Sequence, residues 1–142
     1  MAFIEFERTG AVATIRLNRP ERMNALGTDI LLELKAAYEE INNNDEIRVG
    51  IITGNGRAFC AGRDMKEANT AEKDLSEHAT TIHYKLYMEN HRPKPMLSAV
   101  NGYAGGAGFY LATRAVDLVV AAESAMFQIA EVPRGILHGW QT

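Results

Sequence analysis

The feature that most constrains this chain is the run Val100–Tyr110, which carries four glycines between a predicted buried strand and a predicted helix. Residues without a β-carbon let a backbone run close to a ligand and leave amide N–H groups able to point at it. The helix is predicted to begin there because the sequence from Phe109 to Thr113 contains no helix breaker. The run therefore predicts a cradle for an anion or an oxyanion.

Nucleotide-binding loops are the first alternative, because they also place a glycine-rich turn before a helix. From Gly106 the pattern G-x-G is followed by Phe109–Leu111, so the third small residue of G-x-G-x-x-G is missing. No Gly-Lys-Ser or Gly-Lys-Thr completes a phosphate loop either. The segment alone leaves a second alternative open, in which the glycines only let a helix pack closely against a strand.

The whole chain has the composition of an ordinary protein domain, with 142 residues, 46% hydrophobic and 23% charged. A net charge of −3 argues against a general nucleic-acid surface. The single cysteine, Cys60, excludes an intrachain disulfide and a multi-cysteine metal site, and it fits a reducing compartment. We expect a cytoplasmic protein with no membrane segment and no nucleic-acid partner.

Period-two alternation on both sides of Thr9-Gly10 predicts a hairpin with one buried face, made of residues 3–8 and 12–17. Helical spacing of apolar residues predicts two helices, and short apolar runs predict buried strands. In chain order, these elements are a helix over 28–42 with Thr28 as its cap, a strand over 49–53 buried on both faces, a helix over 71–89, and strands over 96–100 and 117–122. This alternation predicts an α/β layer structure with crossover connections.

A second loop shares the logic of the glycine-rich run. Residues 56–65 follow the predicted strand 49–53 and contain small residues at Ala58, Cys60, Ala61 and Gly62. Two such strand-end loops could each direct one amide at a shared oxygen, which would stabilise the enolate or oxyanion formed when a thioester reacts. Neither loop is specific by itself.

Four motifs in this order resemble the crotonase (enoyl-CoA hydratase/isomerase) superfamily. They are Asn18-Arg-Pro20 with Asn24-Ala-Leu26, then Gly56-Arg-Ala-Phe-Cys-Ala-Gly-Arg-Asp64, then Val100-Asn-Gly-Tyr-Ala-Gly-Gly-Ala-Gly108, then Phe127-Gln-Ile-Ala-Glu131 with Gly135-Ile136. The resemblance implies an α/β, crotonase-like (ClpP/crotonase) spiral of repeated β-β-α units, incomplete at its C-terminal end. Residues 1–142 would form a single core domain that lacks the usual C-terminal helical region.

The resemblance also implies a site for a CoA thioester. An oxyanion hole would be formed by the backbone N–H groups of Arg63 and Ala107. The residues expected beside the pantetheine and nucleotide of CoA are Arg22, Ala25, Ala61 and Asp64. Because CoA is part of the substrate, no separate cofactor and no metal ion are expected.

Carboxylates decide the reaction. In hydratases of the family two glutamates flank the substrate, and this chain supplies Glu131 at the second position but Tyr110 at the first. Adding water across an enoyl double bond needs water activated on one side and a proton delivered to Cα. A tyrosine hydroxyl can hold water but is a poor base at neutral pH. Glu131 and Tyr110 are the candidate catalytic residues.

The leading hypothesis is an acyl-CoA enzyme of the hydratase/isomerase type, with enoyl-CoA hydratase as the first activity. The alternatives are a double-bond isomerase that uses Glu131 alone, and a catalytically inactive CoA-binding or assembly protein. The resemblance also implies a homo-oligomer, a trimer or a hexamer, with acyl-CoA as the substrate.

Some features depart from the family or stand apart from it. Residues 137–142 lack the expected Pro-Gly-Gly continuation, so we expect a truncated or frame-altered chain. The histidine spacing does not match a metal-ligand pair at i, i+4, so we interpret His78, His83, His91 and His138 as solvated. Cys60 has no adjacent general base, and we interpret it as a small packing residue.

Overall fold

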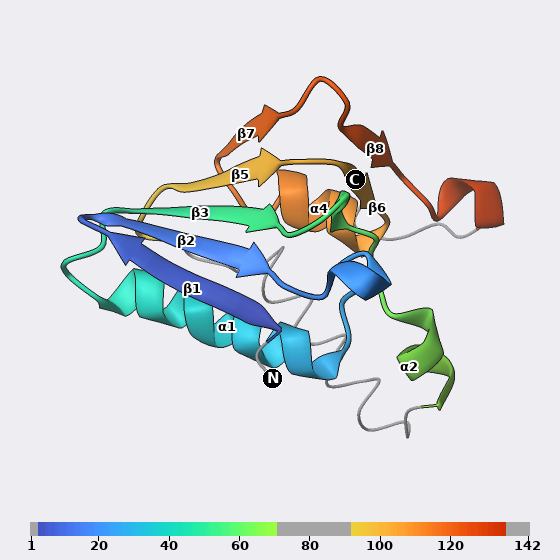
Figure 1. Cartoon of the computed structure of the whole chain (residues 1–142), viewed down its shortest axis with the longest axis horizontal. Coiled ribbons are helices and arrows are strands. Elements are labelled where there is room, and N and C mark those ends of the chain that lie inside the picture. The colour runs from blue at the N-terminus through green and yellow to red at the C-terminus, as the bar shows by residue number, and fades with distance from the viewer. Residues whose placement is uncertain (1–2, 71–91, 136–142) are drawn as a thin grey trace.

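The computed structural model describes residues 3–70 and 92–135, which form two β-sheets and their connecting helices (Figure 1). The elements are β1 (Ile4–Thr9), β2 (Val12–Leu17), the 3-10 helix η1 (Pro20–Arg22), α1 (Thr28–Asn43), β3 (Val49–Gly54), β4 (Ala58–Cys60), α2 (Met65–Thr70), β5 (Met96–Val100), β6 (Tyr103–Gly105), α4 (Ala107–Thr113), β7 (Leu118–Ala121), β8 (Met126–Gln128) and the 3-10 helix η2 (Val132–Arg134). The predicted helix over 71–89 and the four histidines lie outside the described residues.

The predicted N-terminal hairpin is confirmed. β1 and β2 pair antiparallel, with Thr9 opposite Val12 and Ile4 opposite Leu17. Gly10 has a φ of 60° in the connecting turn, a left-handed conformation that favours glycine. One face of β2 is fully buried, while most of β1 is exposed because this strand forms the edge of its sheet.

The larger sheet has the order β1-β2-β3-β5-β7, and every pair after the first is parallel. Parallel neighbours require crossover connections, so the predicted α/β layer structure is confirmed. α1 and α4 cover the same face of this sheet. A β-carbon on Gly50 would meet Ile41 of α1, and Ser98 on the same face donates its hydroxyl to the Ala112 carbonyl of α4 at 2.7 Å.

Helix α1 buries the four residues whose helical spacing predicted it, Leu31, Leu34, Tyr38 and Ile41, and it also buries Ile30 and Ala37. Its N-terminus differs from the prediction. The N-cap is Gly27, and the Thr28 N–H donates to Glu67 Oε1 of α2 at 2.7 Å. The acceptor that Thr28 was expected to supply therefore comes from a carboxylate 39 residues away.

Two predicted strands are less buried than their apolar runs indicate. Val49 and Ile51 of β3 are partly exposed, because α1 and α4 cover only the opposite face. All four residues of β7 are exposed, including Val119 at 44% and Val120 at 63%. β7 is the last strand of its sheet, so among the described residues no strand pairs with its outer edge.

A second, smaller sheet consists of three parallel strands of three residues each, in the order β4-β6-β8. None of these strands was predicted, because three residues are too short to show a period. α4 lies against strands of both sheets. The sheet is important for the site because β4 leads into residues 61–64 and β6 leads into Gly106.

The burial pattern of α1 predicts a sharp contrast between two adjacent leucines. Leu31 is fully buried, whereas Leu32 is 43% exposed. Replacing Leu31 by alanine should lower the free energy of unfolding by about 2 to 5 kcal/mol, because the cavity forms in a packed core. The matched change Leu32→Ala should cost less than about 1 kcal/mol. Urea unfolding followed by circular dichroism measures both, and equal losses would contradict this packing.

Candidate active site

The two loops singled out from the sequence meet at Gly62. A β-carbon on Gly62 would lie 2.6 Å from the Gly105 carbonyl oxygen and 3.2 Å from the Ala107 nitrogen. Gly62 also has a φ of 97°, which a residue with a side chain rarely adopts. Both observations require glycine here, and the close approach brings residues 62–63 against the start of α4.

The hydrogen bonds around Arg63 set the direction of its N–H group. The Leu26 N–H donates to the Gly62 carbonyl at 2.7 Å, and the Asp64 N–H donates to the Leu26 carbonyl at 3.0 Å. In a trans peptide the carbonyl and the following N–H point in opposite directions. The N–H of Arg63 therefore points away from Leu26, out of the opposite side of the segment.

The second predicted donor, Ala107, is the first residue of α4, and Gly106 is the N-cap. The Gly106 N–H donates to the Gln128 carbonyl of β8 at 3.0 Å, which anchors the loop to the smaller sheet. A helix directs its first N–H groups outward along its axis. The structure thus brings the backbones of Arg63 and Ala107 into one neighbourhood, as the sequence predicts.

Glu131 lies beside the same loop, at the N-cap of η2. A β-carbon on Gly106 would stand 3.5 Å from Glu131 Oε1. The other oxygen, Oε2, is buried and has no hydrogen-bond partner among the residues that the structure describes. A buried carboxylate oxygen without a donor is costly, and such groups mark strained or functional positions.

Tyr110, the other candidate catalytic residue, lies in the first turns of α4 and is 3% exposed. Its ring packs edge-on against Phe109, with the ring centroids 5.5 Å apart. Phe109 in turn packs edge-on against Phe127 of β8, with the ring centroids 6.2 Å apart. An aromatic cluster therefore occupies the position at which family hydratases are expected to have a glutamate.

Asn24 organises the far side of the loop over residues 56–65, a role that its sequence motif did not reveal. It is fully buried, and its Nδ2 lies within 3.1 Å of the carbonyl oxygens of Asn55, Ala58 and Phe59. Its Oδ1 accepts the Arg19 N–H at 2.9 Å. A left-handed φ of 55° permits this geometry, and asparagine tolerates that conformation better than most residues.

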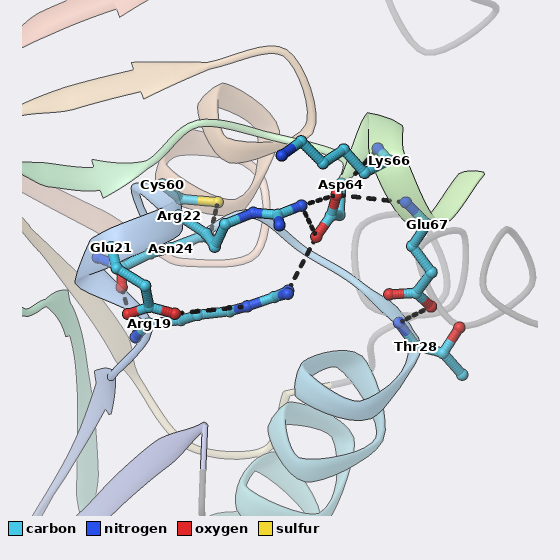
Figure 2. A network of polar contacts seen from close by, with 9 residues as sticks. All are labelled: Arg19, Glu21, Arg22, Asn24, Thr28, Cys60, Asp64, Lys66 and Glu67. Atoms are coloured by element: carbon cyan, nitrogen blue, oxygen red, sulfur yellow. Dashed lines mark hydrogen bonds and ion pairs between the residues drawn. The ribbon is translucent and has the colours of Figure 1, made fainter. Parts of the chain in front are cut away.

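A polar network centred on Asp64 joins η1 to the start of α2 (Figure 2). Arg22 Nη2 lies 2.8 Å from Asp64 Oδ1 and 3.0 Å from Oδ2, and Arg19 Nη1 lies 3.0 Å from Oδ2. Asp64 Oδ1 also accepts the N–H groups of Lys66 and Glu67. The side chain of Asp64 is only 3% exposed, so it acts as the shared partner of two arginines.

The environment of Asp64 favours its ionised form. Burial alone would raise the pKa of this carboxyl, but the N–H groups of Glu67 and Lys66, together with Arg22, outweigh it and lower the pKa. Arg22 and Asp64 are part of this network, and backbone bonds hold the other two predicted CoA-binding residues beside it. The Ala25 N–H donates to the Arg22 carbonyl, and the Ala61 N–H donates to the Met23 carbonyl. Their contact with CoA remains a prediction.

Cys60 is fully buried and donates to the Asn24 carbonyl at 3.1 Å. Burial raises the pKa of its thiol to about 12, although a hydrogen bond from Gly62 acts in the opposite direction. A thiol with this pKa is not a nucleophile at neutral pH. The interpretation of Cys60 as a packing residue is confirmed.

Comparison with known proteins identifies the family. The enoyl-CoA hydratase/isomerase family model matches residues 7–142. The chain is 39% identical over 140 residues to the 2,3-dehydroadipyl-CoA hydratase of Escherichia coli, covering 98% of this chain and 54% of that protein. It is 36% identical over 142 residues to the 1,2-epoxyphenylacetyl-CoA isomerase of the same organism, covering 96% and 54%.

Among solved structures, the enoyl-CoA hydratase of Bacillus anthracis superposes with a TM-score of 0.87 at 36% identity, over 96% of this chain and 54% of that chain. The chain therefore belongs to the enoyl-CoA hydratase/isomerase family, and the predicted crotonase-like α/β fold is confirmed. It spans about half the length of the curated relatives it matches. None of the helices described in residues 3–70 and 92–135 has the length and apolar character that a membrane span needs.

The lowered pKa of Asp64 predicts a pH-dependent contribution to stability. The carboxyl of an unfolded aspartate has a pKa of about 3.9. Because the folded-state pKa is lower, Asp64 stabilises the fold above about pH 4, and this contribution is lost as the pH falls through the folded-state value. Asp64→Asn should therefore lower the free energy of unfolding by about 2 kcal/mol at neutral pH, since it leaves two arginines without their partner.

Urea unfolding of the wild type and Asp64→Asn at a series of pH values measures this contribution. The difference between the two proteins should shrink as the solution is acidified below about pH 4. Glu39→Gln, which removes an exposed ion pair with Lys35, is the control and should change stability by less than about 0.5 kcal/mol. A difference that stays constant with pH would contradict the assigned role of Asp64.

Proposed function

We propose that this chain carries an acyl-CoA site of the hydratase/isomerase type. In this proposal the thioester oxygen accepts hydrogen bonds from the N–H groups of Arg63 and Ala107, and Glu131 moves the proton. CoA enters as part of the substrate, beside the Arg22–Asp64 network. Membership in the enoyl-CoA hydratase/isomerase family supports the substrate class.

The close approach of Gly62 to Ala107 supports the oxyanion hole. Two main-chain donors held by separate structural elements need little reorganisation when negative charge develops on a thioester oxygen. Removing one such donor in other enzymes typically costs about 3 to 4 kcal/mol of transition-state stabilisation. An enolate formed at this position would therefore be stabilised by the backbone itself, whatever side chains surround it.

The observation that carries the proposal is the position of Glu131. One of its oxygens approaches Gly106, and the other is buried without a protein donor among the described residues. Such a group is suited to exchange a proton with a bound molecule, because a ligand would supply the missing partner. Glu131 thus stands where it could remove or deliver a proton next to an enolate.

Hydration is the first candidate reaction, and isomerisation is the second. A specific observation favours the second: Tyr110, at the position of the other expected glutamate, is almost fully buried against Phe109. Isomerisation needs a single base, which takes a proton from Cα of a 3-enoyl thioester and returns it at Cγ. Hydration needs an activated water as well, which Tyr110 could only hold by hydrogen bonding.

Two substrates and two variants separate these reactions. Crotonyl-CoA loses the absorbance of its conjugated thioester when it is hydrated, and a 3-enoyl-CoA gains that absorbance when it is isomerised. Glu131→Gln should lower kcat for either reaction by about 10²-fold or more, because it removes the proton carrier. Tyr110→Phe should lower hydration only, since isomerisation does not require a held water.

Circular dichroism and thermal melting of each variant serve as controls for folding. Full activity of Glu131→Gln on both substrates would contradict the assignment of the base. Saturable CoA binding by the wild type without turnover of either substrate would contradict an enzymatic role, and it would favour a CoA-binding or assembly protein.

A further inference from the structure

We propose that Tyr103 is a positioning residue that, through Gln128, holds Glu131 over the glycine-rich loop. This inference rests on the proposed function, because it assigns a role in aligning the proton carrier of that site. Tyr103 begins β6, and Gln128 ends the neighbouring strand β8 (Figure 1). Neither residue was among the site residues predicted from the sequence.

The two side chains meet across the smaller sheet. The Tyr103 hydroxyl donates to Gln128 Oε1 at 2.5 Å. Gln128 pairs with Gly105, two residues after Tyr103, so all three positions lie on one face of the sheet. A β-carbon on Gly105 would stand 2.2 Å from the Tyr103 hydroxyl oxygen and 2.5 Å from Cζ. Gly105 therefore leaves the space that the tyrosine ring needs to reach Gln128.

Gln128 links the glycine-rich loop to the segment that carries Glu131. Its backbone carbonyl accepts the Gly106 N–H at 3.0 Å, while its side chain accepts the Tyr103 hydroxyl. Glu131 follows three residues later, and its Oε1 returns to the same glycine, Gly106. The Tyr103–Gln128 bond therefore holds the end of β8, and the position of this end sets where Glu131 lies relative to the glycine-rich loop.

Besides this side-chain bond, β8 is held in the described structure by its backbone pairing with β6 and by the edge-on packing of Phe127 against Phe109. The strand is three residues long, all of them exposed, and it forms the edge of its sheet. Few backbone bonds can therefore set its register, and a cross-strand side-chain bond contributes a larger share than it would in a central strand. A small shift of β8 would move the Glu131 carboxylate relative to an enolate, and misplacement by about 1 Å can cost about 10²-fold in rate.

Two substitutions that each remove this hydrogen bond test the proposal. Tyr103→Phe deletes the donor, and Gln128→Met deletes the acceptor while keeping the side-chain length. Each should lower kcat by about tenfold with KM changed less than about twofold, because the carboxylate is misplaced while CoA binding is unchanged. The double variant should be no worse than either single variant, and Gln128→Glu, which keeps an acceptor oxygen, should restore most of kcat.

Tyr38→Phe is the matched control. It also deletes one tyrosine hydroxyl, which donates to the Ala115 carbonyl at 3.0 Å, but Tyr38 lies in α1, on the core side of the larger sheet. Its kcat should equal that of the wild type. The positioning role is overturned if Tyr103→Phe behaves like Tyr38→Phe, if KM rises as kcat falls, or if the two single losses multiply in the double variant.

Hydrogen exchange separates this proposal from the proposed function. If the wild type turns over neither substrate, the proposed function fails, but the link between β6 and β8 can still be measured at the Gly106 amide. That amide should exchange several times faster in Tyr103→Phe than in Tyr38→Phe, because its acceptor is the Gln128 carbonyl. Equal exchange rates in the two variants would overturn the proposal that the Tyr103–Gln128 hydrogen bond holds β8 in place.

Discussion

Gly62 lies so close to the glycine-rich loop that a β-carbon at this position would stand 2.6 Å from the Gly105 carbonyl oxygen. This contact joins two loops that are more than 40 residues apart in the sequence, and each loop follows a strand of the smaller sheet. It brings the Gly62–Arg63 peptide beside the first residue of α4. The proposed oxyanion hole and the position of Glu131 relative to it both depend on this backbone approach, which a side chain at residue 62 would prevent.

Polar side chains hold the same segment from its other side. The Asn24 side-chain amide donates to backbone carbonyl oxygens before and within β4. The Asp64 carboxylate pairs with two arginines and accepts two N–H groups at the start of α2. Leu26 fixes the peptide between them through two backbone bonds. The segment that carries Arg63 is thus restrained on both sides, which is the condition under which main-chain donors stabilise developing charge well. The charged residues thus hold the backbone in place, and in the proposed function it is the backbone N–H groups that would bind the thioester oxygen.

The sequence predicted the parts whose signals are local or whose motifs are specific. Period two identified the hairpin, and helical spacing identified the buried stripe of α1. The ordered motifs singled out Arg63, Ala107 and Glu131, which lie near one another in the structure, while their roles stay predictions. It missed features that depend on distant partners, such as the Glu67 carboxylate at the start of α1 and the three carbonyls bound by Asn24. It also overestimated the burial of β7, because an apolar run does not reveal what covers it. The alternative interpretation of the glycines, that they let a helix pack closely against a strand, holds at Gly108 of α4, which packs against the Cys60 carbonyl of β4.

The central claim is that the N–H groups of Arg63 and Ala107 converge on one thioester oxygen. Its most direct test is to follow the ¹H–¹⁵N signals of these two amides while a short acyl-CoA thioester, or the matching CoA thioether without a carbonyl oxygen, is titrated into the protein. Two hydrogen bonds to one oxygen predict that both amide protons move downfield with the thioester and that neither does with the thioether. A response of only one amide, or the same response to both ligands, would contradict the claim.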